Sequence, residues 1–496
     1  MFQNIINNIF LIEHSMFFFF SFFLLSIISL YSIKFEKENT VKAISLFIGC
    51  IVFIFSCWLL RNFNSDLYSF QYLFSYNAGS ELLNITFLFG LDNISILFFV
   101  LSSFLVLLCI LFIWNEKNFK EYAIALLSIE LFLLLIFSVL DLFLFYVFFE
   151  AILIPMFLLI GIWGSRERKT RASYLFFFYT LCGSIMLLIG ILYIYKITGT
   201  LNIEYILPFK FSFKEQQILW ICFFLSFASK IPMFPFHIWL PEAHVEAPTV
   251  GSVLLAGILL KLGVYGFIRF SITLFPEASL FFSPLVYLLS IIGVLYASMS
   301  AIRQTDLKRI IAYSSIAHMN LVTIGIFSFN VLGIEGAILQ SVSHGFVSGG
   351  MFLLIGVLYD RYHSRFLYYY GGLVHMMPIY AIFLLIFTLA NIAIPGTSSF
   401  VGEFLILAGI FKTNIVTSIL SALGVILCGA YSLWLYNRII FGNLKTEYTV
   451  KFKDMELREF IVLIPLFILI FFMGIYSPFF SNFIHVMSTN LAFLII

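Results

Sequence analysis

The chain has 496 residues, of which 62% are hydrophobic and 10% are charged, and its formal net charge is +2. A soluble protein of this length is about one quarter charged, so this composition excludes a soluble globular protein and indicates one that is surrounded by lipid. The sequence has no long basic tract, which excludes nucleic acid as a partner.

Apolar stretches that are long enough to cross a membrane recur along the chain. A transmembrane helix needs about 20 mostly apolar residues. The sequence therefore predicts an all-α integral membrane protein with about fourteen transmembrane helices, at residues 15–33, 43–60, 86–113, 122–139, 141–163, 172–195, 217–239, 248–271, 280–302, 308–329, 333–359, 379–411, 415–437 and 459–478. The first stretch lacks the basic start and the cleavage site of a signal peptide, so we expect a retained helix.

The basic residues support this count. Lys and Arg gather in the loops on one side of a membrane. Loops after odd-numbered helices contain most of the 27 Lys and Arg residues, and loops after even-numbered helices contain few. This asymmetry places both termini on the opposite, outer side. Two basic residues, Lys230 and Lys261, fit in no loop.

Several ionisable residues lie deep inside predicted helices. Charges deep in a membrane cost several kcal/mol unless they are paired or hydrated, so they often mark ion paths. Each residue alone has a structural alternative, since Lys can extend to the lipid headgroups and His can hydrogen-bond a neighbouring helix. Glu130, which no motif surrounds, fits that structural alternative. The set as a whole favours an ion path formed by Glu150, Lys230, Lys261, His318, His344 and Glu403.

Two of the predicted helices are interrupted. Pro232 and Pro235 follow Lys230, and the segment 395–399 precedes Glu403. Transporters place such breaks at ion sites, in matching positions of inverted repeats. The two interrupted helices are five helices apart along the chain. A repeat unit that crosses the membrane an odd number of times leaves its second copy in the inverted orientation. We expect about three N-terminal helices in 1–121, one five-helix repeat in 122–271, its inverted copy in 280–437, and a C-terminal loop and helix in 438–496.

The sequence offers no pattern for a cofactor. No two of the six cysteines lie within four residues of each other, so there is no CxxC pair for zinc or an iron–sulfur cluster. No glycine-rich nucleotide-binding motif follows a strand pattern. We therefore expect no redox cofactor in this chain.

The motifs around these residues resemble a known family. The segment SFASKIPMFPFHIWLPEAHVEAPTVGSVLLAGILLKLGVYGFIRF, residues 226–270, is similar to the antiporter-like core of the family of NADH-ubiquinone oxidoreductase chain 4. The stretches DLFLFYVFFEAILIPMFLLIGIWGSRERK, AYSSIAHMNLVTIG, SHGFVSGGMFLLIGVLYDR and IPGTSSFVGEFLIL resemble the same family. The resemblance runs from about residue 89 to residue 442.

This resemblance implies a proton-translocating subunit of respiratory complex I in the inner mitochondrial membrane. It implies that Glu150 pairs with Lys230, that Lys261, His318 and His344 form a hydrophilic axis, and that Glu403 lies near the outer exit. It also implies basic loops in the matrix and termini in the intermembrane space. The flavin, the iron–sulfur clusters and the quinone are expected in partner subunits, and the partners include the antiporter-like chains 2 and 5 and membrane lipids.

Two alternatives remain open at the level of sequence. A cation/proton antiporter subunit of the multi-subunit type shares this core and needs neither NADH nor quinone. A scaffold that organises the membrane arm and carries no protons is the second alternative. The proteins that accompany the chain distinguish these possibilities.

Overall fold

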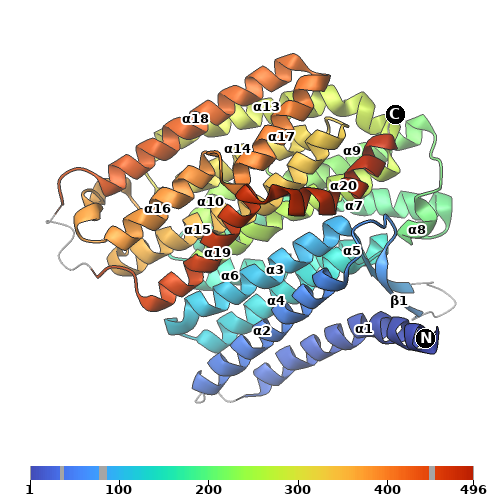
Figure 1. Cartoon of the computed structure of the whole chain (residues 1–496), viewed down its shortest axis with the longest axis horizontal. Helices are drawn as coiled ribbons and strands as arrows, with labels where there is room; N and C mark the ends of the chain where they lie inside the picture. The colour runs from blue at the N-terminus through green and yellow to red at the C-terminus, as the bar shows by residue number, and fades with distance from the viewer. Residues whose placement is uncertain (1, 34–37, 78–85, 446–452, 495–496) are drawn as a thin grey trace.

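The computed structural model describes residues 2–33, 38–77, 86–445 and 453–494. Figure 1 shows helices that lie side by side, with the N-terminal helices at one edge and α13 and α18 at the opposite edge. Ten helices of the described residues are long and apolar enough to cross a membrane. Each of the fourteen predicted segments overlaps a helix or an interrupted helix, and the total number of crossings stays a prediction. The predicted class is confirmed: the chain is an all-α, multi-pass membrane protein.

The N-terminal part contains an unpredicted β-hairpin. Its elements are α1 (Phe2–Ser32), α2 (Glu38–Asn62), β1 (Gln71–Asn77), β2 (Thr86–Leu91), α3 (Asn93–Phe112) and η1 (Ile113–Asn115). The two strands are antiparallel, with Phe74 opposite Phe89. The prediction that a helix begins at residue 86 is therefore wrong. Asp92 caps α3 instead, because its carboxylate accepts a hydrogen bond from the Ser95 N–H at 2.9 Å.

The next helices correspond to the first predicted repeat. They are α4 (Phe119–Ser138), α5 (Leu142–Ala151), α6 (Leu153–Trp163), α7 (Lys169–Thr198), α8 (Ile203–Ile206), α9 (Phe213–Lys230), α10 (Trp239–Glu246), α11 (Thr249–Leu254), η2 (Leu255–Leu259), α12 (Leu260–Gly266) and η3 (Phe267–Ile272). The last four form one continuous helical rod in which η2 and η3 are π-helical turns.

The next elements fall in the second predicted repeat and are followed by two C-terminal helices, and the relation between the two sets stays a prediction. Together they are α13 (Pro276–Arg303), α14 (Leu307–Ile326), α15 (Val331–Tyr362), η4 (Leu367–Tyr369), η5 (Leu373–His375), α16 (Pro378–Asn391), α17 (Ser398–Thr413), α18 (Ile415–Ile440), α19 (Leu457–Ile475) and α20 (Ser477–Phe493). The last predicted helix ends at residue 478, so α20 is also unpredicted.

Two helices form the centre of the molecule. In the rod α11–η3 and in the helix α15, every residue of the most apolar stretch is buried inside the protein. The rod packs against α15, and α15 packs closely on α17. These central helices carry Lys261 and His344, so the fold keeps both side chains away from lipid.

Candidate functional site

The first interrupted helix ends at Lys230. Pro232 and Pro235 lack the N–H that a continuing helix needs, and the helix resumes only at Trp239. The Trp239 indole donates to the Ser229 carbonyl at 2.9 Å, and the Asn320 amide donates to the Pro232 carbonyl at 3.5 Å. Side chains thus satisfy the carbonyl groups that the break exposes.

Lys230 lies against an aromatic ring rather than in an ion pair. Its ammonium is 4.5 Å from the centre of the Phe149 ring, and the residue is 2% exposed. Glu150, the next residue along α5, lies within electrostatic range of Lys230. No hydrogen bond joins Glu150 and Lys230 in the described part of the chain. The predicted pair is therefore close in space and is not in direct contact.

Lys261 is fully buried in the middle of the central rod. Its Nζ donates to the Ala256 carbonyl at 2.5 Å, across the wide π-helical turn that precedes it. The same ammonium lies 2.8 Å from Nδ1 of His344 on α15. π-Helical turns often occur at functional positions, and here the turn places a lysine amine between a carbonyl and an imidazole.

A line of polar side chains continues from His344. The rings of His344 and His318 are 5.8 Å apart between centroids. Nδ1 of His318 lies 2.9 Å from Oε1 of Glu403, which also accepts a hydrogen bond from Gln340 at 2.9 Å. Lys261 and His344 form one contacting pair and His318 and Glu403 another, and the two imidazole rings bring these pairs side by side on the central rod, α15, α14 and α17.

The second interrupted helix places Glu403. α16 ends at Asn391 and α17 begins at Ser398; between them the backbone takes left-handed values at Ala393, with φ of 63°, and Gly396, with φ of 95°. The hydroxyl of Thr397 donates to the Ile394 carbonyl at 2.7 Å. Ser398 shares a 2.9 Å contact with Ser343 of α15. The break thus turns the chain so that Glu403, in the second turn of α17, faces α15.

The structure brings four of the six predicted residues together and sets Glu150 and Lys230 apart as a second group. It also shows two buried residues that the sequence interpretation did not single out, His244 and Lys308. His244 belongs to α10, is 0% exposed, and stacks on the Phe352 ring at 4.7 Å with an interplanar angle of 7°. Lys308 is buried in the first turn of α14 and donates to the Ala247 carbonyl at 2.8 Å.

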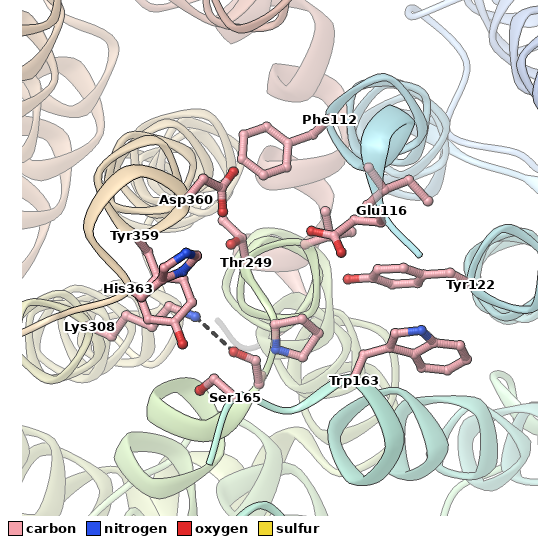
Figure 2. A pocket seen from close by; sticks show the side chains of 14 residues that line it. Phe112, Glu116, Tyr122, Trp163, Ser165, Thr249, Lys308, Tyr359, Asp360 and His363 are labelled. Carbon is pink, nitrogen blue, oxygen red and sulfur yellow. Dashed lines mark hydrogen bonds between the residues drawn. The ribbon is translucent and has the colours of Figure 1, made fainter. Parts of the chain in front are cut away.

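A cavity of about 270 Å³ lies at one end of this region (Figure 2). Its polar lining includes Glu116, Lys308, Asp360 and His363. The segments around it all follow odd-numbered predicted helices, which is the side of the basic loops. The cavity therefore lies among the segments that the sequence predicts to form the basic-loop side.

The described residues contain no cluster of three or more His, Cys, Asp or Glu side chains that could hold a metal ion. Glu130 is completely buried on α4, and neither of its carboxylate oxygens has a hydrogen-bond partner within the described ranges. Its surroundings connect it to no member of the polar line.

Comparison with known proteins identifies the family. The family model described as NADH:quinone oxidoreductase/Mrp antiporter matches residues 139–428. NADH-ubiquinone oxidoreductase chain 4 of Chondrus crispus is 51% identical and covers 95% of this chain and 96% of its own, and the chain 4 protein of Arabidopsis thaliana is 52% identical over 92% of each.

Solved structures have the same fold. A chain of respiratory complex I from Thermus thermophilus is 30% identical, with a TM-score of 0.86 over 98% of this chain and 99% of that chain. A chain of the Mrp complex from Dietzia is 19% identical with a TM-score of 0.85 over 98% of this chain and 99% of that chain, which shows a shared fold. From the identity to curated relatives over nearly its full length, the chain belongs to the family of NADH-ubiquinone oxidoreductase chain 4.

Proposed function

We propose that this chain is a proton-translocating, antiporter-like subunit of respiratory complex I. The observation that carries the proposal is the row of buried groups from Lys261 through His344 and His318 to Glu403, with contacts of 2.8 and 2.9 Å at its two ends and 5.8 Å between the centroids of the two imidazole rings in the middle. Buried ionisable groups of this kind are costly in a membrane and are typical of proton relays. The names of the relatives agree with this function.

The geometry supports a sequence of proton transfers. Nζ of Lys261 gives a proton to Nδ1 of His344, which then releases its Nε2 proton to the neighbouring His318 ring, 5.8 Å away between centroids. His318 passes the proton on its Nδ1 to Oε1 of Glu403, and the protonated carboxyl of Glu403 releases it to the outer side. Imidazole suits this role because it exchanges protons near neutral pH through two separate nitrogens.

Glu150 and Lys230 control the beginning of the line in this proposal. A carboxylate close to an ammonium favours its charged form. The aromatic contact of Lys230 with Phe149 is a second way to hold the charge. Movement of Glu150 toward Lys230 holds the proton, and separation lets it leave toward Lys261.

The setting of this function is part of the proposal. We place the chain in the inner mitochondrial membrane, with its basic loops in the matrix and its termini in the intermembrane space. NADH oxidation and quinone reduction occur in partner subunits that hold the flavin and the iron–sulfur clusters, and this chain carries no redox centre. The antiporter-like chains 2 and 5 are the proposed neighbours, and residues 122–271 and 280–437 are the proposed inverted repeats.

The test is Lys261→Ala in the intact complex, with protons pumped per NADH oxidised as the measurement. We expect a loss of pumping because the line then has no donor to His344. Lys412→Ala is the matched control, since Lys412 is exposed at the end of α17. Pumping equal to that of the control would refute the proposed path.

A further inference from the structure

The row of buried groups is interrupted between its two histidines. Nδ1 of His344 contacts Lys261 at 2.8 Å, but the buried Nε2 of His344 has no hydrogen-bond partner in the part of the chain that the structure describes. The neighbouring ring of His318 lies 5.8 Å away between centroids. Buried polar groups are nearly always hydrogen-bonded, so an unpaired one requires a reason. The unpaired Nε2 marks the place where the row is open.

The second nitrogen of His318 is held by a thiol on α18. While Nδ1 of His318 contacts Glu403 at 2.9 Å, its Nε2 lies 3.7 Å from Sγ of Cys428. Cys428 is 3% exposed and His318 is 6% exposed, so both groups are shielded from bulk solvent. Both nitrogens of His318 are thus occupied, and neither is free to meet His344.

The thiol has a second acceptor for its single hydrogen. Sγ of Cys428 lies 3.4 Å from the carbonyl oxygen of Asn391, the last residue of α16, where the second interrupted helix breaks. The hydroxyl of Tyr431, one turn further along α18, lies 2.9 Å from Sγ and holds the thiol in place. Since a thiol has only one hydrogen to donate, the Asn391 carbonyl and Nε2 of His318 compete for it. The side chain can therefore hold His318 or release it without the movement of a helix.

The other end of the row has no comparable block. Lys230 rests on the ring of Phe149 and makes no hydrogen bond to Glu150 within the described residues. This is the separated arrangement that, in the proposed function, lets the proton leave toward Lys261. The contact between Lys261 and His344 is also formed. The space between the two imidazole rings is therefore the point at which this conformation stops a proton.

We propose that Cys428 is a positioning residue that closes the proton path by holding Nε2 of His318 away from His344. The inference rests on the proposed proton path and adds its gate. When the thiol hydrogen turns to the Asn391 carbonyl, Nε2 of His318 accepts the proton from Nε2 of His344, and Nδ1 of His318 gives its proton to Glu403. The His318 ring carries as many protons afterwards as before. A pump needs a closed position of this kind, because a path that is open to both sides at once lets protons flow back.

The experiment measures proton backflow through the intact complex, reconstituted in lipid vesicles with a preset pH gradient and no NADH. Cys428→Ala removes the thiol, so Nε2 of His318 becomes free to meet His344. We expect the gradient to decay about fivefold faster than with the unmodified complex, the change in population that about 1 kcal/mol produces. Cys109→Ala is the matched control, because it removes a similarly buried thiol from α3.

A double variant separates a gate from a packing defect. Cys428→Ala combined with Lys261→Ala should keep the gradient like the unmodified complex, because backflow along the row needs Lys261, whereas a leak through loosened packing would remain. A decay in Cys428→Ala no faster than in Cys109→Ala, or an equally fast decay in the double variant, overturns the gate and leaves the proposed path standing. If Lys261→Ala alone pumps normally with NADH, both proposals fail.

Tyr431→Phe keeps the test decisive if Cys428→Ala does not assemble. This variant removes only the hydroxyl that holds the thiol. We expect backflow faster than in Cys109→Ala and again suppressed by Lys261→Ala. A gradient as stable as that of the control would overturn the gate.

Discussion

At the scale of single residues, the molecule stabilises its membrane charges in two different ways. His318 and Glu403 face each other at 2.9 Å, whereas Lys230 rests on the ring of Phe149. A cation over an aromatic ring contributes about 0.5–2 kcal/mol, and a hydrogen bond to a charged group contributes about 1.5–3 kcal/mol. The histidine end of the line is therefore held more firmly than the lysine at the first break.

Lys230→Ala and Glu150→Gln test whether these two residues act as a unit. We expect each single variant to lower the number of protons pumped per NADH, since either one removes the control of the proton on Lys230. The double variant is expected to be no worse than the more severe single variant, because residues that act together are not additive. Losses that add in the double variant would show that the two residues work independently.

Gln340 is a positioning residue for Glu403. Its amide donates to Oε1 of Glu403 at 2.9 Å, the same oxygen that His318 contacts. Gln340→Leu removes this donor, and a lost hydrogen bond to a charged group corresponds to about 1.5–3 kcal/mol. We expect reduced pumping with normal assembly, measured as protons per NADH, and partial recovery in Gln340→Asn. Full activity of Gln340→Leu would mean that Glu403 keeps its position without the amide.

At the scale of helices, the contact between α15 and α17 depends on glycine. A Cβ at Gly402 would lie 2.7 Å from the backbone N of Gln340, and a Cβ at Gly336 would lie 2.7 Å from the backbone N of Ile406. These two glycines let the helices approach closely enough for Gln340 and Glu403 to meet. Backbone atoms cannot move aside as a flexible side chain can, so the contact tolerates no added methyl group.

Gly402→Ala is expected to separate α15 from α17. Overpacking of a tight contact costs about 1–3 kcal/mol, so the complex with this variant should denature at a lower temperature, measured by loss of NADH oxidation after heating. Gly349→Ala on α15 is the matched control, because a Cβ there meets its nearest neighbours at 3.6 and 3.7 Å, an ordinary contact. Equal stability of the two variants would contradict the role of Gly402.

Hydropathy predicted the long helices and both interruptions, since proline and apolar length act locally along the chain. It missed the hairpin of β1 and β2, because the mostly apolar residues of β2 directly precede a capped helix and look like its first turns. It also missed α10, which is only eight residues long and contains Glu242, His244 and Glu246. Burial of this charged segment depends on α7, α11 and α14, which pack around it, and no local pattern reports such contacts. The connected line likewise required the packing of four distant helices.

At the scale of the whole molecule, the C-terminal helix α20 contacts both the N-terminal helix α3 and the central helix α15. Nδ1 of His485 and the hydroxyl of Ser488 lie 2.6 and 3.0 Å from Oε1 of Glu335 at the start of α15. The Asn93 amide of α3 donates to the Phe483 carbonyl at 2.8 Å. Figure 1 shows α20, in red at the end of the chain, beside these central helices. The C-terminal helix therefore holds the N-terminal helices and the second set against each other.

The buried residues are compatible with a complex I subunit and with a cation/proton antiporter. The proteins that cover the exposed surface of the chain distinguish these two functions. Large apolar side chains project from the outer face of α7, among them Phe178, Ile189 and Leu192, and they must meet lipid or partner subunits. We expect the chain, extracted in mild detergent and separated on a native gel, to migrate in a high-mass band that oxidises NADH and in which mass spectrometry finds it. That result follows if the line from Lys261 to Glu403 is driven by electron transfer in partner subunits. Migration in a smaller band without NADH oxidation would favour a cation/proton antiporter, and proton flux driven by sodium or potassium would then be the activity to assay.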